Sequence, residues 1–145
     1  MRRFVVSAFV ALLLGPVLTS PVVAARSSVV TARPATIDFH TRQVGTENYK
    51  RTKITNSSNG DVAILVSAGL PDDFGFGLMP GSTCPVLSPE TLAAGESCYA
   101  VVRYSPTEFF AGSEQLGSLI VTATDPASGQ ELATLVIPVT GTGSL

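Results

Sequence analysis

Apolar and polar residues alternate along most of this chain after residue 34, and the alternation predicts β-strands. Apolar residues recur at every second position, whereas no stretch of a dozen residues shows the spacing of an amphipathic helix. Strands are expected at 36–39, 49–56, 62–68, 98–104, 119–123 and 135–139. Clusters of turn-forming residues at 56–60 and 125–129 separate some of them. The pattern therefore predicts six or seven short strands.

The apolar positions of each strand define the face that packs inward. The polar positions between them, such as Arg51 and Lys53, are expected to face water. This one-sided pattern is typical of antiparallel sheets, so the chain is predicted to be an all-β, antiparallel sandwich of about seven strands. Pro138 should point outward and mark a sheet edge or a bulge. The expected inward sets are Ile37 and Phe39; Thr52 and Ile54; Val62, Ile64 and Val66; Cys98, Ala100, Val102 and Tyr104; Leu119, Val121 and Ala123; Leu135, Ile137 and Val139.

Two segments rich in phenylalanine do not fit a long strand. Phe74 and Phe76 alternate with glycines in residues 70–80, which predicts either a short strand or a loop folded over one end of the core. Phe109 and Phe110 follow Pro106, and their side chains either cap the sandwich or form an exposed adhesive patch. Both segments are candidate partner-binding loops.

The first 24 residues have the three parts of a secretory signal. A basic start precedes the apolar run 4–18, and small residues at 22 and 24 mark a cleavage site after Ala24. The alternative is an uncleaved membrane anchor, but the run is short for a span and Gly15-Pro16 interrupts it. We expect an exported protein without a membrane span in its mature form: a flexible segment at 25–33 and one domain at 34–143, placed outside the cell, at the wall or in the periplasm.

Charge argues against nucleic acid as a partner. Removal of residues 1–24 leaves seven basic and eleven acidic residues, a net charge of −4. Phosphate backbones require clustered lysine and arginine. The basic cluster of Lys50, Arg51 and Lys53 is more typical of a solvated strand face or a protected edge than of a binding patch.

The two cysteines, Cys84 and Cys98, both lie in the exported part and allow one pairing. Oxidising compartments favour disulfides. A metal site is the alternative, but two thiols do not complete a zinc site, and the single histidine, His40, lies far away in sequence. We therefore predict a disulfide.

Candidate chemistry is sparse, and no catalytic, cofactor-binding or metal-binding residue is predicted. A nucleophilic enzyme needs a base beside its nucleophile, and His40 is expected on the outer face of a strand. Asp72 and Asp73 are expected in a solvated loop, and together with Asp61 they form no spaced calcium motif. An enzyme is therefore not expected.

An ordered set of motifs resembles an immunoglobulin-like domain family. The motifs are Pro34–Phe39, Val44–Thr46, Lys53–Asn56, Asp73-Phe74, Cys84, Leu92–Cys98, Val102–Pro106, Gly117–Leu119 and Val139–Gly143. Together they resemble an ASH-type domain, related to major sperm protein and to bacterial "choice-of-anchor D" repeats. The resemblance implies a seven-stranded immunoglobulin-like sandwich, a cysteine pair and no catalytic residues. It differs from the usual repeats in having one copy and Ala93-Ala94-Gly95 in place of Pro-Gly.

The expected function is a secreted, non-catalytic module that binds protein or serves as a structural component of the cell envelope. Its partner is expected to be another protein or a cell-surface component, reached through the loops around Phe74, Phe76, Phe109 and Phe110. The alternative is an assembly helper that pairs a client strand with an edge strand.

Overall fold

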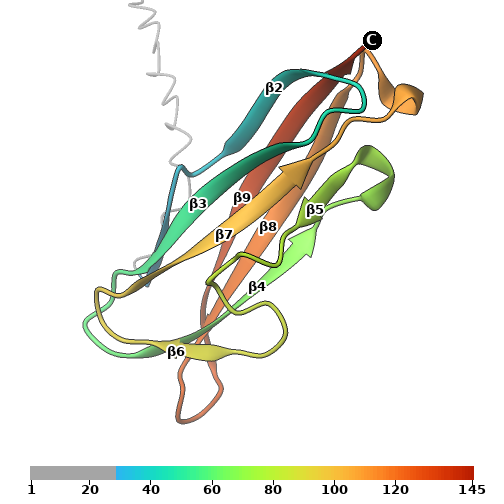
Figure 1. Ribbon diagram of the computed structural model, residues 1–145. Coiled ribbons are helices and arrows are strands. Elements are labelled where there is room, and N and C mark those ends of the chain that lie inside the picture. The colour runs from blue at the N-terminus through green and yellow to red at the C-terminus, as the bar shows by residue number, and fades with distance from the viewer. Residues whose placement is uncertain (1–28) are drawn as a thin grey trace, which may run out of the picture.

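The computed structural model describes residues 29–145, which form two β-sheets packed face to face (Figure 1). The predicted all-β, immunoglobulin-like sandwich is confirmed, with nine strands in these residues. The proposed signal and its cleavage site lie outside the described part. In chain order the elements are β1 (Val30–Arg33), β2 (Ile37–Gln43), β3 (Asn48–Asn56), β4 (Val62–Gly69), the 3-10 turn η1 (Asp72–Phe74), β5 (Phe76–Leu78), β6 (Glu90–Leu92), β7 (Ser97–Tyr104), the 3-10 turn η2 (Glu108–Phe110), β8 (Glu114–Thr124) and β9 (Glu131–Ser144).

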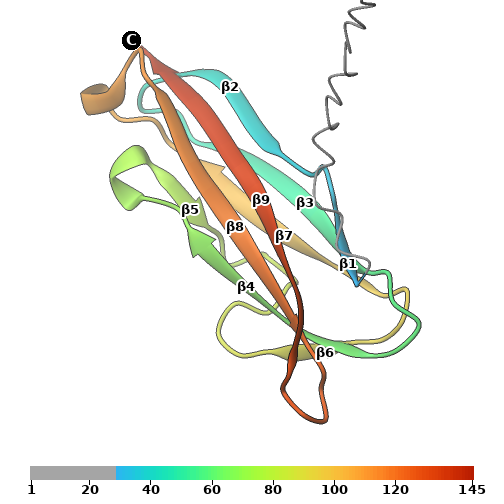
Figure 2. The ribbon, with the colours of Figure 1, turned by 180° about the vertical axis from the view of Figure 1, so that it is seen from behind.

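The nine strands divide into two sheets. Sheet A has the order β1-β3-β7-β5 and lies at the front of Figure 1. Sheet B has the order β2-β9-β8-β4-β6 and is seen from its own side in Figure 2. All pairs in sheet A are antiparallel, with the long β3–β7 pair at its centre. In sheet B the long hairpin of β8 and β9 forms the centre.

One pairing departs from the predicted antiparallel arrangement. β2 runs parallel to β9, with Ile37 opposite Val139. The reason is that the chain crosses from sheet A to sheet B between Arg33 and Ile37 without reversing its direction. The hydroxyl of Thr52 holds this crossover by donating to the carbonyl of Pro34 at 2.8 Å.

The inward sets predicted from alternation fill the core. Of these residues only Leu135 is half-buried rather than buried. Tyr104 is the largest of the fully buried side chains, and its hydroxyl donates to the buried amide oxygen of Gln115. Asn56 is buried as well, and its side-chain amide donates to the carbonyls of Gly60 and Leu92. The polar groups inside the sandwich are thus paired, as burial requires.

The structure differs from the sequence expectation at the start of the domain. Residues 30–33 were expected to be part of a flexible segment, but they form β1 and pair with β3. Val30 is fully buried, whereas Arg33 is exposed. Four residues are too short for periodicity to identify a strand, and pairing with β3 supplies the order that the local sequence does not indicate.

Candidate functional site

The first half of β9 is an open sheet edge. β9 pairs with β8 along residues 131–142, but β2 begins to pair with it only at Val139. Over residues 131–138 no strand of the described part pairs with β9 on the β2 side. We call this stretch the open edge. Pro138, which points outward as predicted, lies at its end, where β9 still has a strand neighbour on one side only.

Main-chain polar groups on the open edge can be assigned a direction. The carbonyl of Ser144 accepts a bond from the main-chain N–H of Val44, on the β2 side, whereas that of Gly143 accepts one from Gly112, on the other side. Because these groups alternate along a strand, even-numbered residues of β9 direct theirs toward the β2 side. Thr134 and Val136 therefore present unpaired N–H and C=O groups to the open edge.

A groove accompanies the open edge. It encloses about 830 Å³ between β1, the crossover 34–36 and residues 134–138 of β9. Leu135 and Ile137 contribute its apolar floor from β9, and Val30 contributes from β1. The groove is thus a gap between the edges of the two sheets, apolar inside and bordered by unpaired main chain.

On the opposite side of the sandwich, residues 79–97 run along the edges of β4 and β7. The carbonyl of Pro85 accepts a bond from the N–H of Val66 in β4 at 2.8 Å. The carbonyl of Tyr99 in β7 accepts from the N–H groups of Thr83 and Cys84. The edges of β4 and β7 are therefore occupied by the chain itself. Proteins protect sheet edges in this way.

The predicted disulfide is confirmed and fastens this covering segment. Cys84 and Cys98 are bonded, and both are almost completely buried. Cys98 lies in β7 and Cys84 in the covering segment, so the bond joins a loop to a core strand. Both sulfurs therefore have a structural role.

The four candidate phenylalanines have different environments. Phe76 is buried, and its ring stacks on that of Tyr104 at 4.7 Å. Phe74 is half-buried and meets Phe110 edge to face at 4.7 Å. Phe109 is 95% exposed on η2. Phe74 and Phe110 therefore cap one end of the sandwich together, and Phe109 offers its ring to solvent or to a partner.

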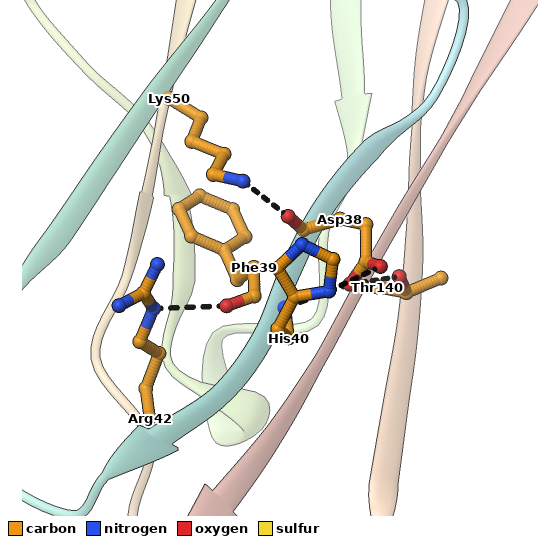
Figure 3. A network of polar contacts seen from close by, with 6 residues as sticks. All are labelled: Asp38, Phe39, His40, Arg42, Lys50 and Thr140. Carbon is orange, nitrogen blue, oxygen red and sulfur yellow. Dashed lines mark hydrogen bonds and ion pairs between the residues drawn. The ribbon is translucent and has the colours of Figure 1, made fainter.

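His40 belongs to a polar network at a bulge in β2 (Figure 3). Its Nδ1 lies 2.7 Å from Oδ2 of Asp38, and its main-chain N–H donates to Oδ1 at 2.7 Å. The hydroxyl of Thr140 also donates to Oδ1, and Lys50 donates to the carbonyl of Asp38. Because His40 has a positive φ of 54°, these bonds hold a backbone conformation that side chains rarely adopt. The network thus stabilises the bulge beside the crossover.

The carboxyl group of Asp38 provides a test of this network. The bond from the His40 main chain is the main cause that lowers the pKa of Asp38 below 3.8. The ionised Asp38 carboxylate therefore stabilises the folded protein. This stabilisation is complete above the pKa that Asp38 has in the unfolded chain, and it is lost as pH falls through its lower pKa in the folded protein. An NMR titration is therefore expected to place the midpoint of Asp38 below 3.8. A midpoint at or above that value contradicts the bond.

The control for this titration is Asp38→Asn, which removes the carboxyl. Its unfolding free energy should depend less on pH in acid than that of the unchanged protein. Asp125, whose pKa is lowered by N–H groups of Ser128 and Ala127, should keep its own dependence.

The other candidate residues do not come together as a metal site within residues 29–145. No three His, Cys, Asp or Glu side chains lie where they would hold a metal ion in this part of the chain. Asp72 and Asp73 line a shallow surface hollow with Phe109 and Phe110, but Asp61 does not join them. Neither of the short helical turns in this range has the length and apolar character of a membrane span.

Comparison with solved structures identifies the fold. The ASH/PapD-like domain 7 of human CEP192 matches with a TM-score of 0.62 at 17% identity, covering 96% of this chain and 97% of that domain. WR4, an MSP family member from C. elegans, matches with a TM-score of 0.55 at 13% identity, covering 79% of this chain and 98% of WR4. The YadV chaperone matches with a TM-score of 0.58 at 10% identity, covering 79% of this chain and 52% of the chaperone.

These likenesses show the immunoglobulin-like fold that MSP, ASH and PapD-like domains share. The chain matches no family model and no curated protein. The finer resemblance, to a single-copy choice-of-anchor D domain of a bacterium, remains a prediction.

Sequence reasoning indicated a sheet edge or a bulge at Pro138, but it did not find the extent of the open edge, which depends on register. Nothing in residues 131–138 distinguishes an edge from a central strand except Pro138, which lacks the N–H that a central ladder needs. That proline was the available signal. The proline alone does not tell an edge from a bulge; the edge follows from the register, because β2 pairs with β9 only from Val139 onward.

Proposed function

We propose that this chain is a non-catalytic module that binds an extended segment of a partner protein, which adds as a strand to the open edge of β9. The observation that carries the proposal is the unpaired main chain of Thr134 and Val136 beside an apolar groove. Strand addition uses both features. Main-chain bonds supply affinity, and alternate side chains enter the groove.

The groove defines the chemistry of the partner segment. Leu135 and Ile137 face inward, so the segment should carry an apolar side chain at every second position. β9 has no charged residue between Leu132 and Ser144. A charged side chain in the groove would therefore lose water without gaining an ionic partner on β9. The charged residue of the groove lining is Arg33 on β1, so the fitting partner is an alternating strand that brings no basic side chain into the groove.

The comparisons support binding of protein. One of the matching structures is the Salmonella enterica SafA pilin in complex with the SafB chaperone, with a TM-score of 0.54. In that structure a pilin is bound to a chaperone, and we extend this kind of protein binding to the present chain. The signal at residues 1–24 and the disulfide support export, so the partner is expected in the cell envelope or at the surface.

A non-catalytic role agrees with the position of His40. Its Nδ1 pairs with Asp38, and the neighbouring polar groups of Asp38 are bonded to Thr140 and Lys50. A catalytic base would need a nucleophile within reach. The network is therefore assigned to the bulge rather than to a reaction.

The test of strand addition is the substitution Val136→Pro. It removes an N–H group from the open edge and spares the bonds to β8, because even-numbered residues direct their main chain toward the β2 side. Val136→Ala is the matched control, since it keeps the N–H and shortens a side chain that faces outward. The probe is a ten-residue peptide of alternating valine and threonine with lysines at both ends.

The unchanged protein and Val136→Ala are expected to bind this peptide, with slowed hydrogen exchange at Thr134 and Val136. Val136→Pro should weaken binding about tenfold or more, the loss expected for a hydrogen bond and the backbone contact beside it. Equal binding by Val136→Pro contradicts the proposal. Phe109→Ser separates the two candidate surfaces, because loss of binding in this variant alone would place the partner on the exposed ring of η2.

A further inference from the structure

The outer face of sheet A concentrates positive charge on an otherwise acidic chain. Residues 29–145 contain eleven acidic side chains and six lysines and arginines. Four of those six, Arg33, Arg51, Lys53 and Arg103, stand on the outward positions of β1, β3 and β7. This concentration is larger than the cluster at residues 50–53, because strand pairing adds Arg33 and Arg103 and turns Lys50 toward the ring of Phe39.

The four cations form a diagonal stripe, which we call the basic stripe. Arg33 lies opposite Lys53. Arg51 follows on the same face of β3, about 6.7 Å further along. Arg103 lies on β7 opposite Tyr49, two residues beyond Arg51. The stripe therefore crosses three strands with steps of about 5 to 8 Å, set by the strand spacing and the rise of the strands.

Aromatic rings accompany the basic stripe. The guanidinium of Arg51 lies 4.9 Å from the ring centre of Tyr99. Tyr49 is half exposed, and its hydroxyl donates to Glu47. Glu47 also pairs with Arg103 at 3.4 Å, and both side chains are partly exposed. The Nε of Arg103 is buried without a hydrogen-bond partner among the described residues. Arg33, Arg51 and Lys53 thus have no acidic partner within residues 29–145.

We propose that the basic stripe binds a linear acidic polysaccharide. Carboxylates on successive sugars would pair with the arginine forks, which match carboxylate geometry with two parallel bonds. The flat apolar faces of the sugar rings would rest on Tyr49 and Tyr99, whose rings are amphipathic. Opposite charge selects the polymer, and the spacing of the stripe favours a repeating anion over a single one.

Other anionic partners fit this face less well. An extended peptide binds a sheet through unpaired main chain, but β3 is paired with β1 on one side and β7 on the other. A membrane surface calls for apolar side chains that insert, and the outward residues here are charged, hydroxylated or aromatic apart from the half-buried Val101. Binding of nucleic acid commonly neutralises about 6–10 phosphates, which is more than the four cations of this face can do.

Arg51, Lys53 and Arg103 lie on the outer face of sheet A and do not line the groove beside the open edge. Arg33 lines that groove as well, so the test variant leaves Arg33 unchanged. The experiment measures binding of polygalacturonate to the purified protein by calorimetry at low ionic strength, with dextran as the neutral polymer. The test variant is Arg51→Gln with Lys53→Gln. Arg42→Gln is the matched control, since it removes a cation that lies on β2, off this face.

Polygalacturonate is expected to bind and dextran not to bind. The double substitution should weaken binding about tenfold or more, as expected for the loss of two charge-assisted contacts, and added salt should weaken binding of the unchanged protein. Arg42→Gln should bind within about twofold of the unchanged protein. Thermal melting confirms that each variant is folded.

Three outcomes overturn the proposal. The first is no binding of polygalacturonate at low ionic strength. The second is binding that the double substitution leaves unchanged. The third is equal or tighter binding of polyglutamate, oligothymidylate or vesicles of phosphatidylglycerol, which would assign the stripe to an acidic protein, a nucleic acid or a membrane instead.

Discussion

Gly75→Ala is expected to destabilise the fold by about 3 kcal/mol or more, because the new methyl group would overlap the main chain of Ser105, the residue that follows β7. A Cβ at this position would lie 1.8 Å from the carbonyl oxygen of Ser105. Gly75 also has φ +79°, and its own carbonyl accepts a bond from the N–H of Ser105 at 2.8 Å. The two segments cannot separate without breaking that bond, so urea denaturation should show a large loss of unfolding free energy.

Gly95→Ala is the matched control for this substitution. Gly95 has φ +80°, nearly the same as Gly75, but a Cβ there meets nothing within 4 Å. Gly95→Ala should therefore lower the unfolding free energy only by the cost of placing a side chain in the left-handed region, about 1 to 2 kcal/mol. If Gly75→Ala loses no more than Gly95→Ala, close approach to Ser105 is not what demands glycine.

Removal of the disulfide is expected to cost about 3 kcal/mol of unfolding free energy, the loop-closure value for a ring of this size. The variant is Cys84→Ala with Cys98→Ala, whose positions are 14 residues apart. Reduction of the unchanged protein should have a similar effect, measured as a lower midpoint of urea denaturation. Reductant should leave the double variant unchanged.

The same variant should loosen the covering segment more than the rest of the fold. In residues 79–97, Pro85 accepts a main-chain hydrogen bond from β4, and Thr83 and Cys84 donate main-chain hydrogen bonds to Tyr99 of β7. Hydrogen exchange at Val66, which donates to Pro85, should therefore accelerate, whereas exchange in the β8–β9 hairpin should change less. Uniform acceleration across both regions would show that the bond acts on the whole sandwich and not on this segment.

Alternation located the long strands because one face of each is exposed to solvent, although it predicted only residues 119–123 of β8 and 135–139 of β9. In β7 the buried positions Cys98, Ala100, Val102 and Tyr104 alternate with partly exposed ones, so the two-residue period is visible in the sequence. The short strands were harder. β5 and β6 have three residues each, and β1 has four, which is too few for a period to appear. These segments are strands because each pairs with a longer strand: β1 with β3, β5 with β7 and β6 with β4.

The candidate surfaces depended even more on pairing. Residues 131–138 become an edge only because β2 joins β9 late. Arg33 and Arg103 join Arg51 and Lys53 only because β1 and β7 flank β3. These residues are 70 positions apart at their extremes, and no local pattern relates them. The sequence shows which side chains are charged, apolar or aromatic, whereas the pairing register of the strands determines which of them lie close together.

The parallel pairing of β2 with β9 also constrains the order in which the fold can be completed. β2 has no neighbour in sheet B other than β9. It is the first strand of sheet B to be synthesised, and β9 is the last strand of residues 29–145. A growing chain can form the β3–β7 pair early, but β2 must wait for its partner until residues 139–144 have left the ribosome. The buried faces of Ile37 and Phe39 therefore stay without their final cover until β9 has been synthesised.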